Sequence, residues 1–155
     1  TWVFHIAAEG TPREAWNAAS CYYPGDDCVD WIGVSIYGRL VGSAGQDASA
    51  KSFSAIMDKV YPGMATLSGS KPIAVLELGI SDNRAVGDKP QWMADARRAM
   101  ADGKYPRLCA VSWWNKTYRP DGSRSTLEVD SSPESLAAYR NGVRDFVEAP
   151  TWSVE

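Results

Sequence analysis

Four residues of this 155-residue chain could take part in chemistry: an imidazole, a phenol, a carboxylate and an indole. They are His5, Tyr37, Glu77 and Trp113, and each lies near the end of a short apolar segment. Glu77 is the most informative, because it ends the apolar segment "KPIAVLELG" at residues 71–79. Charged residues are seldom buried without a partner or a purpose. Whether the four form a site depends on the elements that position them.

Four apolar segments alternate with helical patterns along the chain. Strands are expected at 1–7, 29–37, 72–78 and 107–114, and helices at 12–20, at 51–61, from 90 onward and from 132 onward. Helical spacing of Phe53, Ile56, Met57 and Val60 gives the second helix one apolar face. Ser132 is expected to cap the last helix, with Pro133 at its first position. Strands that alternate with amphipathic helices predict an α/β fold with a parallel sheet covered by helices.

The four candidate residues all fall at the carboxyl ends of the predicted strands. Functional groups gather at this edge of parallel α/β sheets. Because side chains alternate along a strand, Glu77 is expected to share a face with Ile73 and Val75. By the same rule Tyr37 shares a face with Ser35. If these faces point to one interior, the four side chains converge at one end of the sheet.

Composition excludes several classes of function. The formal net charge is −3 and no basic run is present, which argues against a nucleic-acid partner. No apolar run approaches the length of a membrane span. The spacing of Cys21, Cys28 and Cys109 matches no zinc or redox motif, and neither a metal nor a cofactor is expected. Cys21 and Cys28 could pair in an oxidising compartment, or all three could be free thiols. Seven Trp and seven Tyr provide apolar rings with a polar handle, which suit sugar binding.

Five segments resemble glycoside hydrolase family 26. "YYPGDDCVDWIGVSIYG" (22–38), "KPIAVLELG" (71–79) and "PRLCAVSWWN" (106–115) are similar to the sixth, seventh and eighth strands of that family. Residues 130–140, which end in "SPESLAAYR", resemble its final helix, and "WVFHIA" (2–7) resembles its fifth strand. Cys28 stands where the family usually has Tyr, and Trp114 where it usually has Phe. Residues 1–155 therefore resemble the C-terminal half, (β/α)4, of a (β/α)8 TIM-type barrel.

The resemblance implies a retaining β-glycanase, most often a β-mannanase, acting on a β-linked polysaccharide in a secreted or periplasmic location. Some members cleave mixed-linkage β-glucan or β-1,3-xylan. It implies that Glu77 is the nucleophile and that Tyr37 donates a hydrogen bond to it. It also implies that Trp113 forms the floor of the sugar subsite and that Trp114 and Asn115 extend this floor. His5 could be a ligand contact or a satisfied structural group.

The same resemblance leaves the second carboxyl group of a retaining enzyme unassigned. The family carries its acid/base on the fourth strand, which would lie before Thr1. Glu9 and Glu128 are the other acids considered, and neither matches the family motif. The chain could be half of a larger enzyme joined to an N-terminal half-barrel, a half-barrel that pairs with its own copy, or a non-catalytic glycan-binding module.

The remaining acids have simpler interpretations. Asp26 is expected to be a turn residue. Asp30 comes too early on its strand to reach the site at the carboxyl end. Asp82, Asp88 and Asp121 are expected to be solvated loop acids. A flavodoxin-like domain is a weaker alternative, since "AAEGTPRE" after the first strand lacks a phosphate-binding loop.

Overall fold

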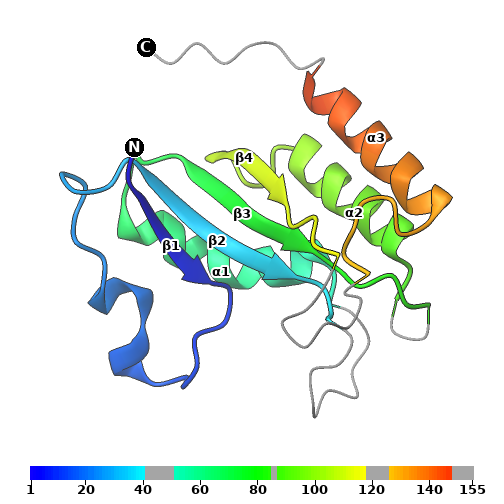
Figure 1. Ribbon diagram of the computed structural model, residues 1–155. Coiled ribbons are helices and arrows are strands. Elements are labelled where there is room, and N and C mark those ends of the chain that lie inside the picture. Colours follow the sequence, from blue (N-terminus) through cyan, green and yellow to red (C-terminus); the bar gives the residue numbers. More distant parts are fainter. Residues whose placement is uncertain (41–50, 85–86, 118–125, 148–155) are drawn as a thin grey trace.

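The computed structural model describes residues 1–40, 51–84, 87–117 and 126–147, and these form a four-stranded sheet with helices between the strands (Figure 1). The strands are β1 (Val3–Ala7), β2 (Trp31–Tyr37), β3 (Ile73–Gly79) and β4 (Leu108–Trp113). The α-helices are α1 (Phe53–Leu67), α2 (Lys89–Ala101) and α3 (Pro133–Val147). Neighbouring strands pair in parallel in the order β1-β2-β3-β4. The predicted α/β fold is confirmed.

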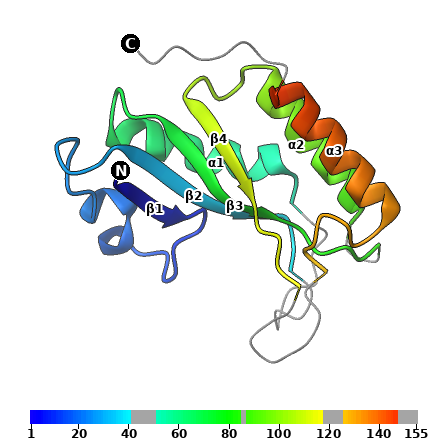
Figure 2. The same cartoon turned by 45° about the horizontal axis from the view of Figure 1, so that its top comes forward.

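The three α-helices lie on one side of the sheet, with α2 and α3 side by side (Figure 2). Ile32, Val34 and Ile36 of β2 point to this side and are fully buried in the core. Phe53 and Met57 of α1 pack into the same core. The alternate residues of β2 point to the other side, which we call the open face of the sheet.

Two local predictions about helices need correction. The sequence predicts one helix over residues 12–20, but the chain forms two 3-10 turns there, η1 (Ala15–Asn17) and η2 (Ala19–Cys21). Ala18 between them is extended, and the two turns have no buried residue that could hold an α-helix against the sheet. Helix α1 runs to Leu67 and not to residue 61, because Met64 beyond Pro62 is fully buried in the core.

Polar side chains cap the three α-helices. Ser52 accepts a hydrogen bond from the Ala55 amide at 3.1 Å and Asp88 accepts one from Gln91 at 2.9 Å. Ser132 accepts from the Ser135 amide at 3.2 Å, which confirms the predicted N-cap of α3. Asp88 is therefore a helix cap and not merely a solvated loop acid.

A bulge in β3 changes which face Glu77 occupies. Val34 pairs with Val75, but the next pair is Ser35 with Glu77, so Leu76 is an extra residue on β3. Residues paired across parallel strands point to the same side, and Val34 and Val75 point into the core. The expectation that Glu77 shares a face with Ile73 and Val75 is wrong. Leu76 adds one residue to the alternation, and Glu77 thereby reaches the open face with Ser35.

Gly38, just past β2, is predicted to be intolerant of any side chain. A Cβ there would lie 2.7 Å from Nε1 and 2.8 Å from Cε2 of Trp92, whose rigid ring is buried. We expect Gly38→Ala to lower the free energy of unfolding by about 1–3 kcal/mol through overpacking. Gly63→Ala is the matched control, since a Cβ there meets nothing within 4 Å and the site is helical. Urea unfolding should show loss of stability for the first change and a gain of about 0.5–1 kcal/mol for the second. Equal midpoints for Gly38→Ala and the unaltered chain would contradict this packing.

Candidate active site

The centre of the candidate site is a phenol that donates to a carboxylate. The Tyr37 hydroxyl lies 2.8 Å from Oε2 of Glu77, within the range expected for a hydrogen bond. Both side chains are half-buried on the open face, at the carboxyl ends of β2 and β3. The predicted contact between these two residues is confirmed.

The surroundings of Tyr37 keep its hydroxyl protonated. Burial raises the pKa of Tyr37 far above the ordinary range of a phenol, and the hydrogen bond to Glu77 and its negative charge raise it further. The phenol is therefore a donor at any physiological pH. Since Oε2 receives that donor, Oε1 of Glu77 is the oxygen available for other chemistry.

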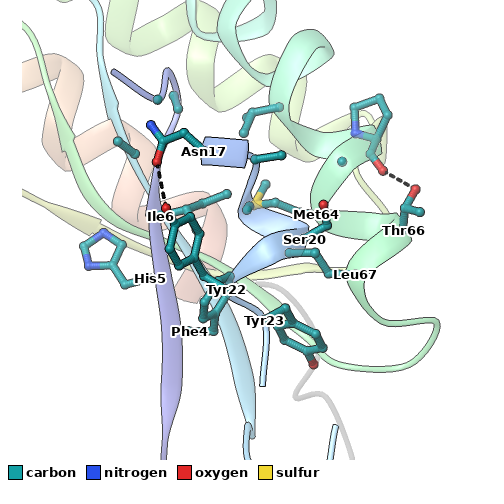
Figure 3. A pocket seen from close by; sticks show the side chains of 18 of the residues that line it. Phe4, His5, Ile6, Asn17, Ser20, Tyr22, Tyr23, Met64, Thr66 and Leu67 are labelled. Atoms are coloured by element: carbon teal, nitrogen blue, oxygen red, sulfur yellow. Dashed lines mark hydrogen bonds between the residues drawn. The ribbon is translucent and has the colours of Figure 1, made fainter. Parts of the chain in front are cut away.

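His5 and Ser35 continue the same row across the sheet. The His5 Nε2 lies 2.8 Å from the Ser35 Oγ, and Ser35 pairs in register with Glu77. His5 is exposed, and Figure 3 shows its ring on the other side of β1 from Met64 and Leu67. Ser35 was not among the predicted site residues, although strand alternation from Tyr37 places it on this face. Imidazole, hydroxyl, carboxylate and phenol thus line the carboxyl ends of three adjacent strands.

Trp113 does not join this row. It pairs with Leu78, a core residue, so its side chain lies on the helix-covered side of the sheet. Its ring centroid is 6.4 Å from that of Trp92 and 6.5 Å from that of Tyr139, and its Nε1 donates to the Leu127 carbonyl at 2.8 Å. The expectation that Trp113 converges with Glu77 and Tyr37 is wrong. The register of β4 against β3 determines which side of the sheet the Trp113 side chain faces.

The next two residues differ in what they contact. The Trp114 amide donates to the Leu78 carbonyl at 2.8 Å, which holds Trp114 beside the end of β3. Alternation turns its side chain away from that of Trp113, and Trp114 is 38% exposed. Asn115 accepts a hydrogen bond from the Val129 amide at 2.9 Å through Oδ1, so it supports the segment before α3.

The two acids considered as proton donors are poorly suited to that role. Lys51 and Arg13 hydrogen-bond Glu9 at 2.7 and 2.5 Å. The bond from Lys51 is the largest cause and lowers the pKa of Glu9; burial, which raises it, comes second, and the bond from Arg13 lowers it further. A general acid must keep its proton near working pH, and these contacts act in the opposite direction. Glu128 is 6% exposed, which denies a polymer access to its carboxylate.

Two further acids have structural partners. Asp26 accepts from the hydroxyls of Tyr23 and Ser68 at 2.7 and 2.8 Å, consistent with its predicted place in a turn. Asp30 accepts from the Trp2 amide at 2.7 Å, at the start of β2 and far from its carboxyl end.

Asp82 accepts from Ser131 at 2.8 Å and from Ser135 at 3.2 Å, so its interpretation as a solvated loop acid is wrong. Asp121 lies outside the described residues. In the structurally described part of the chain, no group of three or more His, Cys, Asp or Glu is placed to hold a metal ion.

A separate cavity of about 900 Å³ lies between β1, the two 3-10 turns and α1 (Figure 3). Ile6, Tyr22, Met64 and Leu67 are among the residues that line it. This space does not include Glu77 or Tyr37 in its lining. Cys21, Cys28 and Cys109 are exposed free thiols in this structure. Across the described ranges, no helix has the length and apolar character to cross a membrane.

The chain is similar to part of a known glycan-degrading enzyme. It is 28% identical over 153 residues to endoglucanase H from Acetivibrio thermocellus, and the match covers 97% of this chain and 15% of that protein. No protein-family model matches the chain.

A solved glycosidase structure shows the same fold. The structure of beta-glycosidase BGL167 aligns with a TM-score of 0.57 and 14% identity, covering 99% of this chain and 42% of that chain. An endo-beta-1,4-glucanase variant from Xanthomonas axonopodis pv. citri aligns with a TM-score of 0.46 and 12% identity, over 78% of this chain and 38% of its own. The alignment with BGL167 shows that the chain has the strand and helix arrangement of part of that structure. The chain spans 15% of the length of endoglucanase H.

The coupling between Tyr37 and Glu77 predicts a shift in titration. We expect Glu77→Gln to lower the pKa of Tyr37, because the substitution removes a negative acceptor while burial of the ring remains. The Cζ resonance of ring-labelled tyrosine, followed by NMR as pH rises, measures this. Tyr105 is the control, since its raised pKa comes from burial and from its bond to Asp58. A Tyr37 titration unchanged by Glu77→Gln would contradict the contact.

Proposed function

We propose that this chain carries the nucleophile half of a retaining β-glycan hydrolase. The observation that carries the proposal is the Tyr37–Glu77 hydrogen bond of 2.8 Å on the open face, at the carboxyl ends of neighbouring parallel strands. That edge is where glycosidase-type barrels hold their reacting groups. The similarity to endoglucanase H and the fold shared with a beta-glycosidase support the same class of reaction.

The residues have distinct roles in this proposal. Oε1 of Glu77 attacks the anomeric carbon and forms a glycosyl-enzyme ester, while the aglycone oxygen leaves with a proton from a second carboxyl group. Tyr37 holds Oε2 and so fixes the direction in which Oε1 points. Water then hydrolyses the ester and restores Glu77. His5 and Ser35 offer polar contacts to sugar hydroxyls from the same row.

The second carboxyl group is proposed to come from outside residues 1–155. Retaining chemistry requires two carboxyl groups about 5–5.5 Å apart. Within the described ranges, Glu9 is held by Lys51 and Arg13 and Glu128 is buried, so neither is suited to protonate a leaving group. In this proposal the chain supplies strands five to eight of a (β/α)8 barrel, and an N-terminal half supplies the acid.

The proposed substrate is β-1,4-mannan, on the basis of the motif resemblance described above. The name of endoglucanase H makes β-1,4-glucan the polymer to compare directly. We place the activity in a secreted or periplasmic location, where such polysaccharides are met.

A second candidate function is glycan binding without hydrolysis, by a half-barrel that associates with another half. It is favoured by the open face of the sheet, which no described helix covers, and by β1 and β4, which are edge strands. The two candidates differ in one property: only the first requires Glu77 to form a covalent bond.

Covalent labelling tests the nucleophile without the second carboxyl group. Dinitrophenyl 2-deoxy-2-fluoro β-mannobioside and its β-cellobioside counterpart carry leaving groups that depart without protonation. We expect the 155-residue chain to gain the mass of one glycosyl group on Glu77, and Glu77→Gln to gain none. Glu14→Gln is the control, because Glu14 is exposed and lies beside η1, outside the site.

Hydrolysis of natural polymer separates the remaining possibilities. The chain alone should release reducing sugar from mannan or glucan more slowly than a complete enzyme by on the order of 10²–10⁴. Binding of oligosaccharide without labelling would support the binding module and refute the nucleophile.

Trp114, rather than Trp113, is predicted to provide the stacking surface. Trp114→Ala should weaken mannohexaose or cellohexaose binding by about 3- to 10-fold, because the indole is partly exposed beside the end of β3, with the Lys116 Nζ 6.0 Å from its ring centroid. Trp113→Ala should instead lower the free energy of unfolding by about 3–5 kcal/mol, since its ring packs among Trp92 and Tyr139. Calorimetry and urea unfolding measure the two effects. Trp16→Ala, at an exposed ring on η1, is the binding control, and the assignment fails if Trp114→Ala binds as tightly as this control.

A further inference from the structure

Lys89 is a fully buried lysine that the proposed chemistry does not use. It opens α2, and 0% of its surface is exposed. Its Nζ donates to the Thr126 carbonyl at 3.0 Å, to the Glu128 carbonyl at 2.7 Å and to the Ser131 Oγ at 2.8 Å. These acceptors match the three hydrogens of an ammonium group. A charge is costly to bury, so this arrangement calls for an explanation.

All three acceptors belong to one segment, residues 126–131, which we call the strap. The strap has other ties as well: Leu127 accepts from Trp113, Val129 donates to Asn115, and Ser131 donates to Asp82 at 2.8 Å. Figure 1 shows the orange segment before α3 running past the ends of β3 and β4. Lys89 contacts the strap at three points.

Leu127 connects the strap to the candidate site. A Cβ built on Gly79 would lie 3.3 Å from Cδ2 of Leu127, and 3.3 Å from both Cδ1 and Cε1 of Tyr37. The Leu127 side chain and the Tyr37 ring therefore both lie close to the bare backbone of Gly79. Leu127 is 6% exposed, so its side chain is almost wholly enclosed by protein. Movement of the strap would free the side of the Tyr37 ring.

We propose that Lys89 is a positioning residue of the site, which holds the strap across the end of β3 so that Leu127 confines the ring of Tyr37 and directs its hydroxyl at Glu77. Lys89 itself touches neither the carboxylate nor the ligand in this arrangement. Its effect on catalysis rests on the proposed function, whereas its effect on the Tyr37–Glu77 pair does not.

The charge of Lys89 gives the proposal a pH signature. Burial lowers the pKa of Lys89 to about 8, and the negative charges of Asp82, Glu128 and Asp130, which face it from the end of β3 and from the strap, act against this shift. Above that pH the neutral amine keeps two N–H donors for three acceptors, so one tie to the strap is lost. The Tyr37 ring should sense this change although Tyr37 itself stays protonated.

The experiment follows the Tyr37 ring by NMR in the 155-residue chain with no ligand present. In the unaltered chain we expect its resonances to move with a midpoint near pH 8. In Lys89→Met they should start from a displaced position and show no such step, and the Val129 amide should exchange with solvent on the order of tenfold faster. Lys104→Met is the control, since Lys104 is exposed and pairs with Asp58 on the surface.

Leu127→Ala leaves the three acceptors of Lys89 unchanged and shortens the side chain that lies beside Gly79. It should displace the Tyr37 resonances while leaving the Val129 exchange rate unchanged. If Lys89→Met does not fold, the proposal is tested by the pH step in the unaltered chain and by the Leu127→Ala spectrum. The proposal would be overturned if the Tyr37 resonances neither shift near pH 8 nor change position in Leu127→Ala. Since no substrate is involved, failure of the labelling experiment would leave this result standing.

Discussion

The extra residue in β3 is the constraint on which the rest of the site depends. Without Leu76 as a bulge, strict alternation would direct Glu77 into the layer between sheet and helices. There it would meet Ile36, Val75 and the apolar side of α2, where a carboxylate has no suitable donor. The bulge instead brings Glu77 beside Ser35 and within reach of the Tyr37 hydroxyl. A single departure from regular strand geometry thus reconciles a stable core with a polar group at the sheet end.

The two faces of the sheet have different roles. The helix-covered face holds the aliphatic and aromatic core that keeps the strands parallel and in register. The open face bears the row of His5, Ser35, Glu77 and Tyr37. Gly33 leaves room for the side chain of Leu76, whose Cδ1 would lie 2.4 Å from a Cβ there. Rigid packing on the helix-covered face holds the polar row in place on the open face.

The strands and their parallel order could be predicted from the sequence because they depend on local periodicity, whereas the Tyr37–Glu77 contact was predicted from the motif resemblance. Features that non-local geometry determines could not be predicted. A bulge has no periodic signature, so the predicted face of Glu77 was wrong although its place at the strand end was right. Trp113 was assigned to the site from its motif, yet the register with Leu78 turns it into the core. The buried role of Lys89 could not be predicted, because its partners are distant in the sequence.

The Trp113–Trp114 dipeptide has a practical consequence. Two indoles joined by one peptide bond lie in contrasting surroundings, one packed between rings under the helices and the other 38% exposed beside the end of β3. The emission of an indole depends on the polarity and mobility of its environment. The chain therefore contains two optical reporters on adjacent residues, one sensitive to melting of the interior and the other to what approaches the sheet edge. A chain that retains only one of the pair, with the other five tryptophans replaced, would let the two events be followed separately in real time.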